Sequence, residues 1–242
     1  MLLHPHCGPL VPLADNLWAS EYELRMGLGF YMPVRMTVLR LGDGSLVLWS
    51  PGPIQEPLAA ELAGLGEVSA LVAPNCLHHL FVAAAKERYP QAKILAAPGL
   101  QEKRADLSID GDLTTPPPSW GGEIELLTIA GAKSLGEVVA LHRPSATLLV
   151  TDLMFNIGDV RGFLTPWIFR MAGVYRRLGQ SRLLRFLVDD RAAAGGSVRE
   201  LLSWPFERVV SAHGAVVDGD DVRERTTAAL HWMLAGTASP PR

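Results

Sequence analysis

Residues able to bind a metal ion follow three separate apolar segments of the sequence. His78 and His79 follow the run VSALVAP, Asp152 ends ATLLVTD, and His213 follows RVVSA. Loops at strand ends are where α/β folds usually place functional sites. Imidazole and carboxylate together suit zinc, iron or manganese. We therefore interpret His78, His79, Asp152 and His213 as candidate ligands of one divalent ion, with one coordination position left for water.

Each of these residues also has an ordinary structural interpretation. Adjacent histidines before a helix are commonly capping or surface residues, and Asp152 in front of LMFN can cap a turn. His213 followed by Gly214 can form a turn. The repetition of one pattern at three strand ends favours a shared site over three unrelated local roles.

Four further residues are candidates for substrate binding or for supporting the ligands. Cys76 is either a nucleophile with His78 or His79 as its base, or a small buried thiol, which we favour. His142 ends EVVALH and is either a donor to the ligands or a plain strand-end residue, which we also favour. Lys133 and Ser134 could bind an anionic substrate group, although exposed loop lysines are common.

The elements that must position these residues form an alternating α/β pattern. The segment MTVLRLGDGSLVLWS surrounds an Asp-Gly turn and predicts a β-hairpin over residues 36–49. Residues 68–97 predict a strand, loop, helix and strand, which is a βαβ unit. Further along we expect three strands (EIELLTIAG, EVVALH, ATLLVTD), helices over LTPWIFRMAGVYRRLG, SRLLRFLVDDRAA and SVRELLSW, the strand RVVSAHG and a last helix.

Composition limits the classes of protein. The chain has 242 residues, 48% hydrophobic and 19% charged, which predicts one folded domain over residues 1–242 with an ordered core of about 13–235. A net charge of −3 argues against binding nucleic acid. With two cysteines, no secretory signal pattern and no membrane span, we expect a cytoplasmic protein. WIFRMAGVYRRLG is typical of a core or dimer helix, so a homodimer is a candidate assembly.

Several strings together resemble a known group of proteins. They are RMTV at 35–38, PNCLHH at 74–79, YPQAK at 89–93, HRPSATLLVTDL at 142–153 and the later VVSAHG. In this order they resemble the metallo-β-lactamase superfamily, and more closely a bacterial branch of it that is a domain of unknown function. The resemblance implies an α/β fold built as a four-layer αββα sandwich, with metal ions between the sheets at one edge.

The resemblance also implies that half of the usual two-metal site is missing. In the superfamily motif His-x-His-x-Asp-His, the first two histidines fall on Pro74 and Cys76, and the histidine of the later Gly-His loop falls on Ala132. These are the positions of the first metal. The positions of the second metal fall on residues that can all bind an ion, namely His78, His79, Asp152 and His213. The site is therefore expected to be at most mononuclear.

Two functions are consistent with this pattern. The first is a metal-dependent hydrolase that acts on a small-molecule ester, thioester, lactone or amide, with zinc as the first candidate ion and with Asp152 as general base if it is not a ligand. The helical region 153–204 would cover the substrate. The second is a metal-free, non-catalytic binding or assembly protein that keeps the scaffold alone, since a fold by itself does not determine function.

Overall fold

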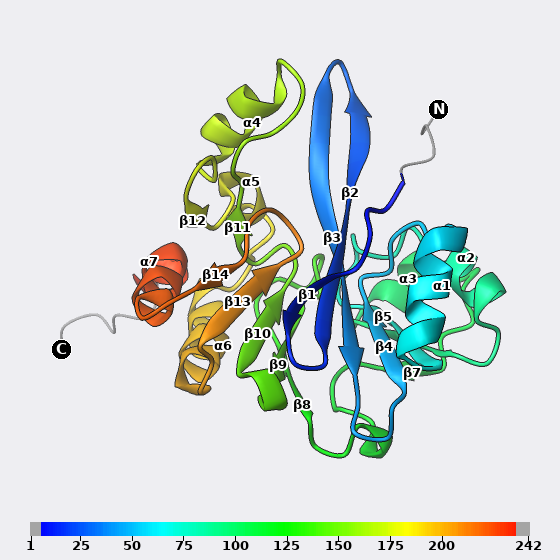
Figure 1. Ribbon diagram of the computed structural model, residues 1–242. Coiled ribbons are helices and arrows are strands. Elements are labelled where there is room, and N and C mark those ends of the chain that lie inside the picture. The colour runs from blue at the N-terminus through cyan, green and yellow to red at the C-terminus, as the bar shows by residue number, and fades with distance from the viewer. Residues whose placement is uncertain (1–5, 236–242) are drawn as a thin grey trace.

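The computed structural model describes residues 6–235, and its first feature is a seven-stranded sheet in the N-terminal half of the chain (Figure 1). The strands lie side by side in chain order, the first four antiparallel and the later ones parallel. They are β1 (Val11–Ala14), β2 (Leu17–Gly27), β3 (Phe30–Arg40), β4 (Leu46–Trp49), β5 (Val68–Ala73), β6 (Lys93–Ala96) and β7 (Gly111–Asp112). Three helices lie against its outer face: α1 (Glu56–Leu65), α2 (Val82–Arg88) and α3 (Leu100–Lys103).

A five-stranded sheet follows in the C-terminal half, with the spatial order β14-β13-β10-β9-β8. Its strands are β8 (Ile124–Thr128), β9 (Val138–His142), β10 (Thr147–Val150), β13 (Arg208–Ser211) and β14 (Val217–Asp218). Helices α6 (Arg191–Ser203) and α7 (Val222–Leu234) cover its outer face (Figure 1). Between β10 and β13 the chain forms β11 (Phe155–Asn156), α4 (Thr165–Ala172), β12 (Leu178–Gly179) and α5 (Arg182–Arg185).

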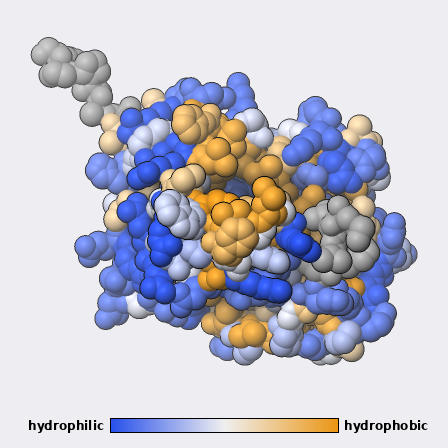
Figure 2. Space-filling view, turned by 90° about the horizontal axis from the view of Figure 1, so that it is seen from above, coloured by the Kyte–Doolittle hydropathy of each residue, from blue (hydrophilic) through white to orange (hydrophobic). Residues whose placement is uncertain are grey.

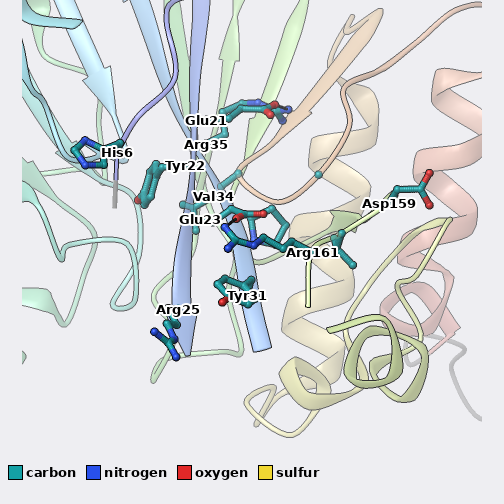
Figure 3. Close-up of a pocket in the computed structure, with 14 residues that line it drawn as sticks. His6, Glu21, Tyr22, Glu23, Arg25, Tyr31, Val34, Arg35, Asp159 and Arg161 are labelled. Carbon is teal, nitrogen blue, oxygen red and sulfur yellow. Dashed lines mark hydrogen bonds and ion pairs between the residues drawn. The ribbon is translucent and has the colours of Figure 1, made fainter. Parts of the chain in front are cut away.

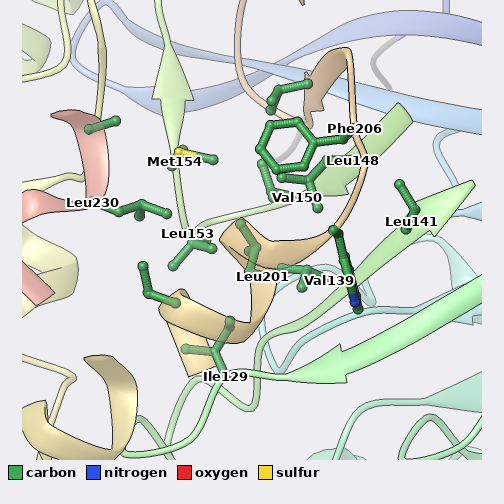
Figure 4. Close-up of a cluster of buried hydrophobic side chains, with 14 of the residues drawn as sticks. Ile129, Val139, Leu141, Leu148, Val150, Leu153, Met154, Leu201, Phe206 and Leu230 are labelled. Carbon is green, nitrogen blue, oxygen red and sulfur yellow. The ribbon is translucent and has the colours of Figure 1, made fainter. Parts of the chain in front are cut away.

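Alternation of side chains along the strands produces the layers. In β4, Leu46 and Leu48 pack in the core under α1 and α2, whereas Val47 and Trp49 pack in the core between the sheets. In β9, Val139 and Leu141 face the core under α6 and α7, which Figure 4 shows. Val138 and Ala140 of the same strand face the other sheet. Successive side chains of a strand point to opposite faces. The order of layers is therefore helix, sheet, sheet, helix, as the family resemblance implies.

The sequence-based elements are confirmed where hydrophobic periodicity is strong. The hairpin over 36–49 is formed by β3 and β4, and β5, α2 and β6 make the expected βαβ unit with parallel strands. The prediction did not include β2, although its residues alternate in polarity. Of the described residues, no helix is long and apolar enough to cross a membrane.

The predicted helices of the region 153–204 are shorter than expected. The helix over LTPWIFRMAGVYRRLG ends at Ala172, because Gly173 takes a left-handed conformation with φ of 80° and its N–H returns to helix carbonyls. The predicted helix SRLLRFLVDDRAA is split into α5 and the start of α6. Asp190 causes the second start, since its side chain accepts a hydrogen bond from Ala193 N and caps α6. The C-terminal tail after residue 235 lies outside the described residues.

Candidate functional site

Three of the predicted ligands meet at one edge of the two sheets. His78 lies in the loop after β5 of the larger sheet, and Asp152 and His213 follow β10 and β13 of the smaller sheet. Strands β10 and β13 are parallel and in register from Thr147↔Arg208 onward, so their C-terminal ends coincide. The topology thus delivers side chains from both sheets to one place, which is where open α/β sheets commonly carry a site.

The three side chains are close enough to share one ion. His78 Nε2 lies 3.1 Å from His213 Nε2. Asp152 lies between them, with Oδ2 at 3.4 Å from His78 Nε2 and Oδ1 at 3.4 Å from His213 Nε2. All three side chains are more than nine-tenths buried. Among the described residues, these three form a group whose ligand atoms all lie within 4.8 Å of one another.

Hydrogen bonds to the outer ring nitrogens fix how the two histidines face each other. His213 Nδ1 donates to the carbonyl of Pro33 at 2.8 Å, so Nε2 of the neutral ring carries the free lone pair. The same ring stacks on Phe155, with centroids 4.6 Å apart. His78 Nδ1 lies 2.6 Å from Ser50 Oγ, which leaves His78 Nε2 turned toward Asp152.

Unusual backbone conformations hold two residues of this site in place. Ser50 has a φ of 56°, in the left-handed region that few residues other than glycine adopt. Gly214, directly after His213, has a φ of 97°, and a Cβ there would lie 2.1 Å from the carbonyl oxygen of Asn156. The loop after β13 can therefore approach β11 this closely only with glycine at position 214.

Two buried polar residues beneath the cluster were not among the sequence predictions. Asn75 Nδ2 donates to Asp152 Oδ2 and to Glu137 Oε2, both at 2.7 Å, while Asn75 Oδ1 accepts from His78 N. Glu137 is fully buried and accepts from the backbone N–H groups of residues 151, 152 and 153. In the sequence, Asn75 directly follows the apolar segment VAP, and Glu137 directly precedes the apolar segment VVAL. A polar residue at the end of an apolar strand is the signal that could have identified both.

The electrostatics of the floor follow from burial and from these contacts. Burial raises the pKa of Asp152, but His78, His213 and Asn75 outweigh it and bring that pKa down to about 2. Burial and the neighbouring charge of Asp152 raise the pKa of Glu137. Burial lowers the pKa of His78 to about 4, against the attraction of Asp152. At neutral pH Asp152 is therefore a carboxylate and His78 a neutral imidazole, which are the protonation states that metal ligands need.

The structure places the fourth predicted ligand, His79, apart from the other three. Its Nδ1 lies 2.8 Å from Nη1 of Arg104. Because a guanidinium only donates, His79 Nδ1 accepts this bond and the proton of the neutral ring is on Nε2. Burial and the charges of Lys103 and Arg104 lower the pKa of His79. In this arrangement His79 offers an N–H group instead of a lone pair.

The remaining candidates lie away from the cluster. Cys76 is buried in the core under α1 and α2, its Sγ is 3.6 Å from Pro98 O, and burial raises the pKa of its thiol. His142 is buried at the far end of β9, where Nδ1 contacts Ser145 Oγ at 2.7 Å. Lys133 and Ser134 are exposed and are not among the residues lining the pocket that contains the cluster.

The donor set fits a single divalent ion. Ligand atoms on the edges of a tetrahedral zinc site, with Zn–N near 2.0–2.1 Å, lie about 3.3–3.4 Å apart. The distances of 3.1 and 3.4 Å within the cluster are close to that spacing. The outer nitrogens of both histidines have oxygen partners, which is the usual arrangement around metal-binding imidazoles.

The cluster forms the floor of a pocket of about 330 Å³, which we call the site pocket. Tyr22, Leu24 and Met26 of β2 and Met32 and Val34 of β3 make one wall. Residues that follow β4, β5, β10 and β13, together with one residue of α3, also line the pocket: Ser50, Pro51, Leu77, His78, His79, Leu80, Lys103, Asp152 and His213. The size is at the lower end of the range for small-molecule sites, about 300–1,000 Å³.

Comparison with solved structures gives the fold family. A metallo-β-lactamase from Pontibacter korlensis matches with a TM-score of 0.63 at 16% identity, covering 93% of this chain and 99% of that one. The Flv1 flavodiiron core from Synechocystis matches with a TM-score of 0.65 at 13% identity, covering 96% and 62%. The mono-zinc form of the metallo-β-lactamase FIM-1 from Pseudomonas aeruginosa matches at 0.61 and 14%, covering 99% and 100%.

Comparison of the sequence gives the family. No curated protein matches it. Residues 14–164 match the family described as "Domain of unknown function (DUF4336)", which covers more than half of the chain and includes His78, His79 and Asp152 but ends before His213. The chain therefore belongs to the DUF4336 family, and its fold is that of the metallo-β-lactamases.

Proposed function

We propose that the protein is a hydrolase that depends on one divalent metal ion, zinc in the first instance, held by His78, Asp152 and His213. The observation that carries the proposal is the convergence of two imidazole Nε2 atoms and one carboxylate within 3.4 Å of one another at the floor of a pocket. The metallo-hydrolase-like scaffold and the neighbour described in a mono-zinc form support it. When bound there, a divalent ion supplies Lewis acidity that activates water and polarises a carbonyl.

The residues of the chain have separate tasks in this proposal. Asp152 stays ionised and accepts from Asn75, so one carboxylate oxygen is held while the other faces His213. Asn75 also binds His78 N and thereby fixes the loop that carries the histidine. His79 remains at the pocket with an Nε2–H that can donate to a substrate oxygen. We propose this donor role for His79 in place of metal binding.

The direct test is metal content and affinity, measured by elemental analysis and by zinc titration. Wild-type protein expressed with zinc is expected to hold one ion per chain. His78→Ala and His213→Ala each remove a ligand and should weaken zinc binding by more than about 100-fold. Asn75 only orients ligands, so Asn75→Ala should weaken zinc binding by about 10- to 100-fold. His231→Ala is the matched control, because His231 is an exposed histidine on α7.

The outcomes separate the two functions named above. Loss of zinc in both histidine variants, with unchanged circular dichroism and an unaffected control, supports the hydrolase. A folded wild-type protein that holds no ion under zinc-replete expression would rule the hydrolase out. That result would favour a non-catalytic binding protein, the reading already suggested by Pro74, Cys76 and Ala132 at the positions of a first metal.

A further inference from the structure

The site pocket is lined mostly by apolar side chains, and three of its polar residues form the cluster of His78, Asp152 and His213. Leu24 and Met32 are partners in the β2–β3 register, and Met26 continues the same face toward the hairpin tip. Leu77 and Leu80, from the segment between β5 and α2, also line the pocket. The cluster of His78, Asp152 and His213 lies at the floor. A ligand that fills this pocket must place an apolar part against the walls and a polar part at the floor.

The apolar lining continues onto the surface. Met26, Leu77 and Leu80 line the pocket and are also about half exposed, at 58%, 45% and 52%. Leu28 at the hairpin tip and Phe163 are more exposed still, and Phe163 packs against Gly29 of the same tip. Figure 2 shows apolar side chains gathered around a hollow on the face that carries this tip. The path from floor to solvent is therefore lined by aliphatic groups.

The volume of the pocket limits the size of the apolar part. At about 30 Å³ for each water-sized group, 330 Å³ holds roughly ten non-hydrogen atoms. The flexible side chains of Met26 and Met32 on one wall can adapt to an unbranched chain. A chain of six to ten carbons matches both the volume and the aliphatic lining.

Two residues that carry hydrogen-bond donors, His79 and Lys103, line the same pocket as the cluster. His79 has its proton on Nε2, as its bond with Arg104 requires. Lys103 lines the same pocket, and its ammonium group uses one of three N–H donors on the carbonyl of Cys76. Both can bind oxygen atoms of the head, and Lys103 adds a positive charge that favours a carboxylate product.

We propose that the site pocket binds medium-chain acyl compounds, with the chain between the β2–β3 wall and Leu77–Leu80 and the carbonyl carbon at the cluster. This assignment rests on the proposed function, for which it names the substrate class: acyl esters and thioesters of about six to ten carbons. In the hydrolysis, the acyl carbon gains the hydroxyl of water, the C–O or C–S bond breaks, and the proton goes to the leaving alcohol or thiol. No oxidant or reductant is needed.

The test measures binding of the product class, so that it does not depend on catalysis. Butyrate, hexanoate, octanoate and decanoate are titrated by calorimetry into zinc-loaded protein and into protein freed of metal with EDTA. Each methylene buried in the pocket should tighten binding about three- to fourfold. From butyrate to octanoate we expect at least a tenfold gain, and we expect this gain in both forms of the protein.

Variants on the two faces of one strand provide the control. Leu24→Asn and the more exposed Met26→Asn place a polar group on the pocket wall and should weaken octanoate binding about tenfold, while butyrate changes less than twofold. Glu23→Gln alters the neighbouring residue on the opposite face and should leave both affinities unchanged. Two variants are used so that a folding defect in one does not decide the result.

The possible failures are distinguishable. Equal affinity for all four acids, no detectable binding of any of them, or a chain-length dependence that survives both wall variants would overturn the acyl assignment even if zinc binds. Chain-length dependence in a protein that never binds zinc would overturn the hydrolase and keep the acyl-binding pocket.

Discussion

The two faces of the β2–β3 ribbon line two pockets of opposite character. On one face Leu24, Met26 and Met32 form the apolar wall of the site pocket. On the other face alternate residues line a second pocket of about 580 Å³, the charged pocket, which Figure 3 shows. Its charged lining comprises Glu21, Glu23, Arg25, Arg35, Asp159 and Arg161.

This difference follows from the period of two along a strand. The register pairs Leu24 with Met32 and Glu23 with Pro33, so each face collects every second residue of both strands. A shift of the register by one residue would place the charges against the histidine cluster. The chemistry of the site therefore depends on strand pairing as much as on the ligands themselves.

The largest expected effect compares two glutamates, one behind the site and one in the charged pocket. Glu137→Ala leaves three buried N–H groups of residues 151–153 without their acceptor and should lower the free energy of unfolding by about 4 kcal/mol. Glu23→Ala removes a half-exposed group whose ion pair with Arg161 spans 4.0 Å, and should cost less than about 0.5 kcal/mol.

Urea unfolding followed by circular dichroism measures both changes. Equal losses for the two glutamates would contradict the distinction between a buried supporting network and a solvated charged face. Zinc titration of Glu137→Gln adds a second readout, since that variant keeps the shape of the side chain and should weaken zinc binding through the displaced Asp152 loop.

The second prediction concerns pH, measured in the presence of EDTA. Burial lowers the pKa of His78 and that of His142 to about 4, below the usual 6.5. The unfolded chain therefore binds protons first as pH falls, so stability is complete above about pH 6.5 and is lost as pH falls toward 4. Each pKa unit corresponds to about 1.4 kcal/mol, and relaxation of the chain around a charged ring reduces the effect. We therefore expect the two histidines together to lower the free energy of unfolding by on the order of 3 kcal/mol.

His142→Asn separates the two histidines. The substitution removes one titrating group far from the site and keeps a polar atom near Ser145 Oγ. The loss of stability between about pH 6.5 and 4 should therefore be about halved. A profile that is flat over this window, or one that His142→Asn leaves unchanged, would contradict the assignment of neutral buried rings. The exposed carboxylates of the charged pocket should contribute little in the same range.

The alternation of strands and helices and three of the proposed ligands follow from local patterns in the sequence, whereas the four layers were expected from the family resemblance. Apolar runs that end in His78, Asp152 and His213 mark the strand ends, and the parallel register of β10 and β13 then brings two of them together. The separation of His79 could not be predicted in this way. It depends on Arg104, which is 25 residues away and reaches the ring only in the folded protein.

Two other omissions have different causes. Strand β2 was missed although its segment YELRM alternates apolar and charged residues. Both of its faces line pockets, and the turn before β3 lacks a pair of residues typical of hairpins, such as Asn-Gly. Asn75 and Glu137 were missed because a buried polar residue cannot be recognised as buried from its own type. Their place at strand ends in otherwise apolar segments was the available signal.

The last prediction, also of a small effect, tests the charged pocket itself. The guanidinium of Arg161 lies 4.9 Å from the ring centroid of Tyr31 and pairs with Glu23, but its side chain is 70% exposed. Exposed cation–π and ion-pair contacts contribute about 0.5–1 kcal/mol. Arg161→Ala should therefore lower the free energy of unfolding by less than about 1 kcal/mol, and the part due to Glu23 should disappear in 1 M salt, where the Debye length is about 3 Å. Because Arg161 lines the charged pocket and is not among the residues lining the site pocket, zinc affinity should stay within twofold of wild type. A larger change would show that the two faces of the ribbon are coupled.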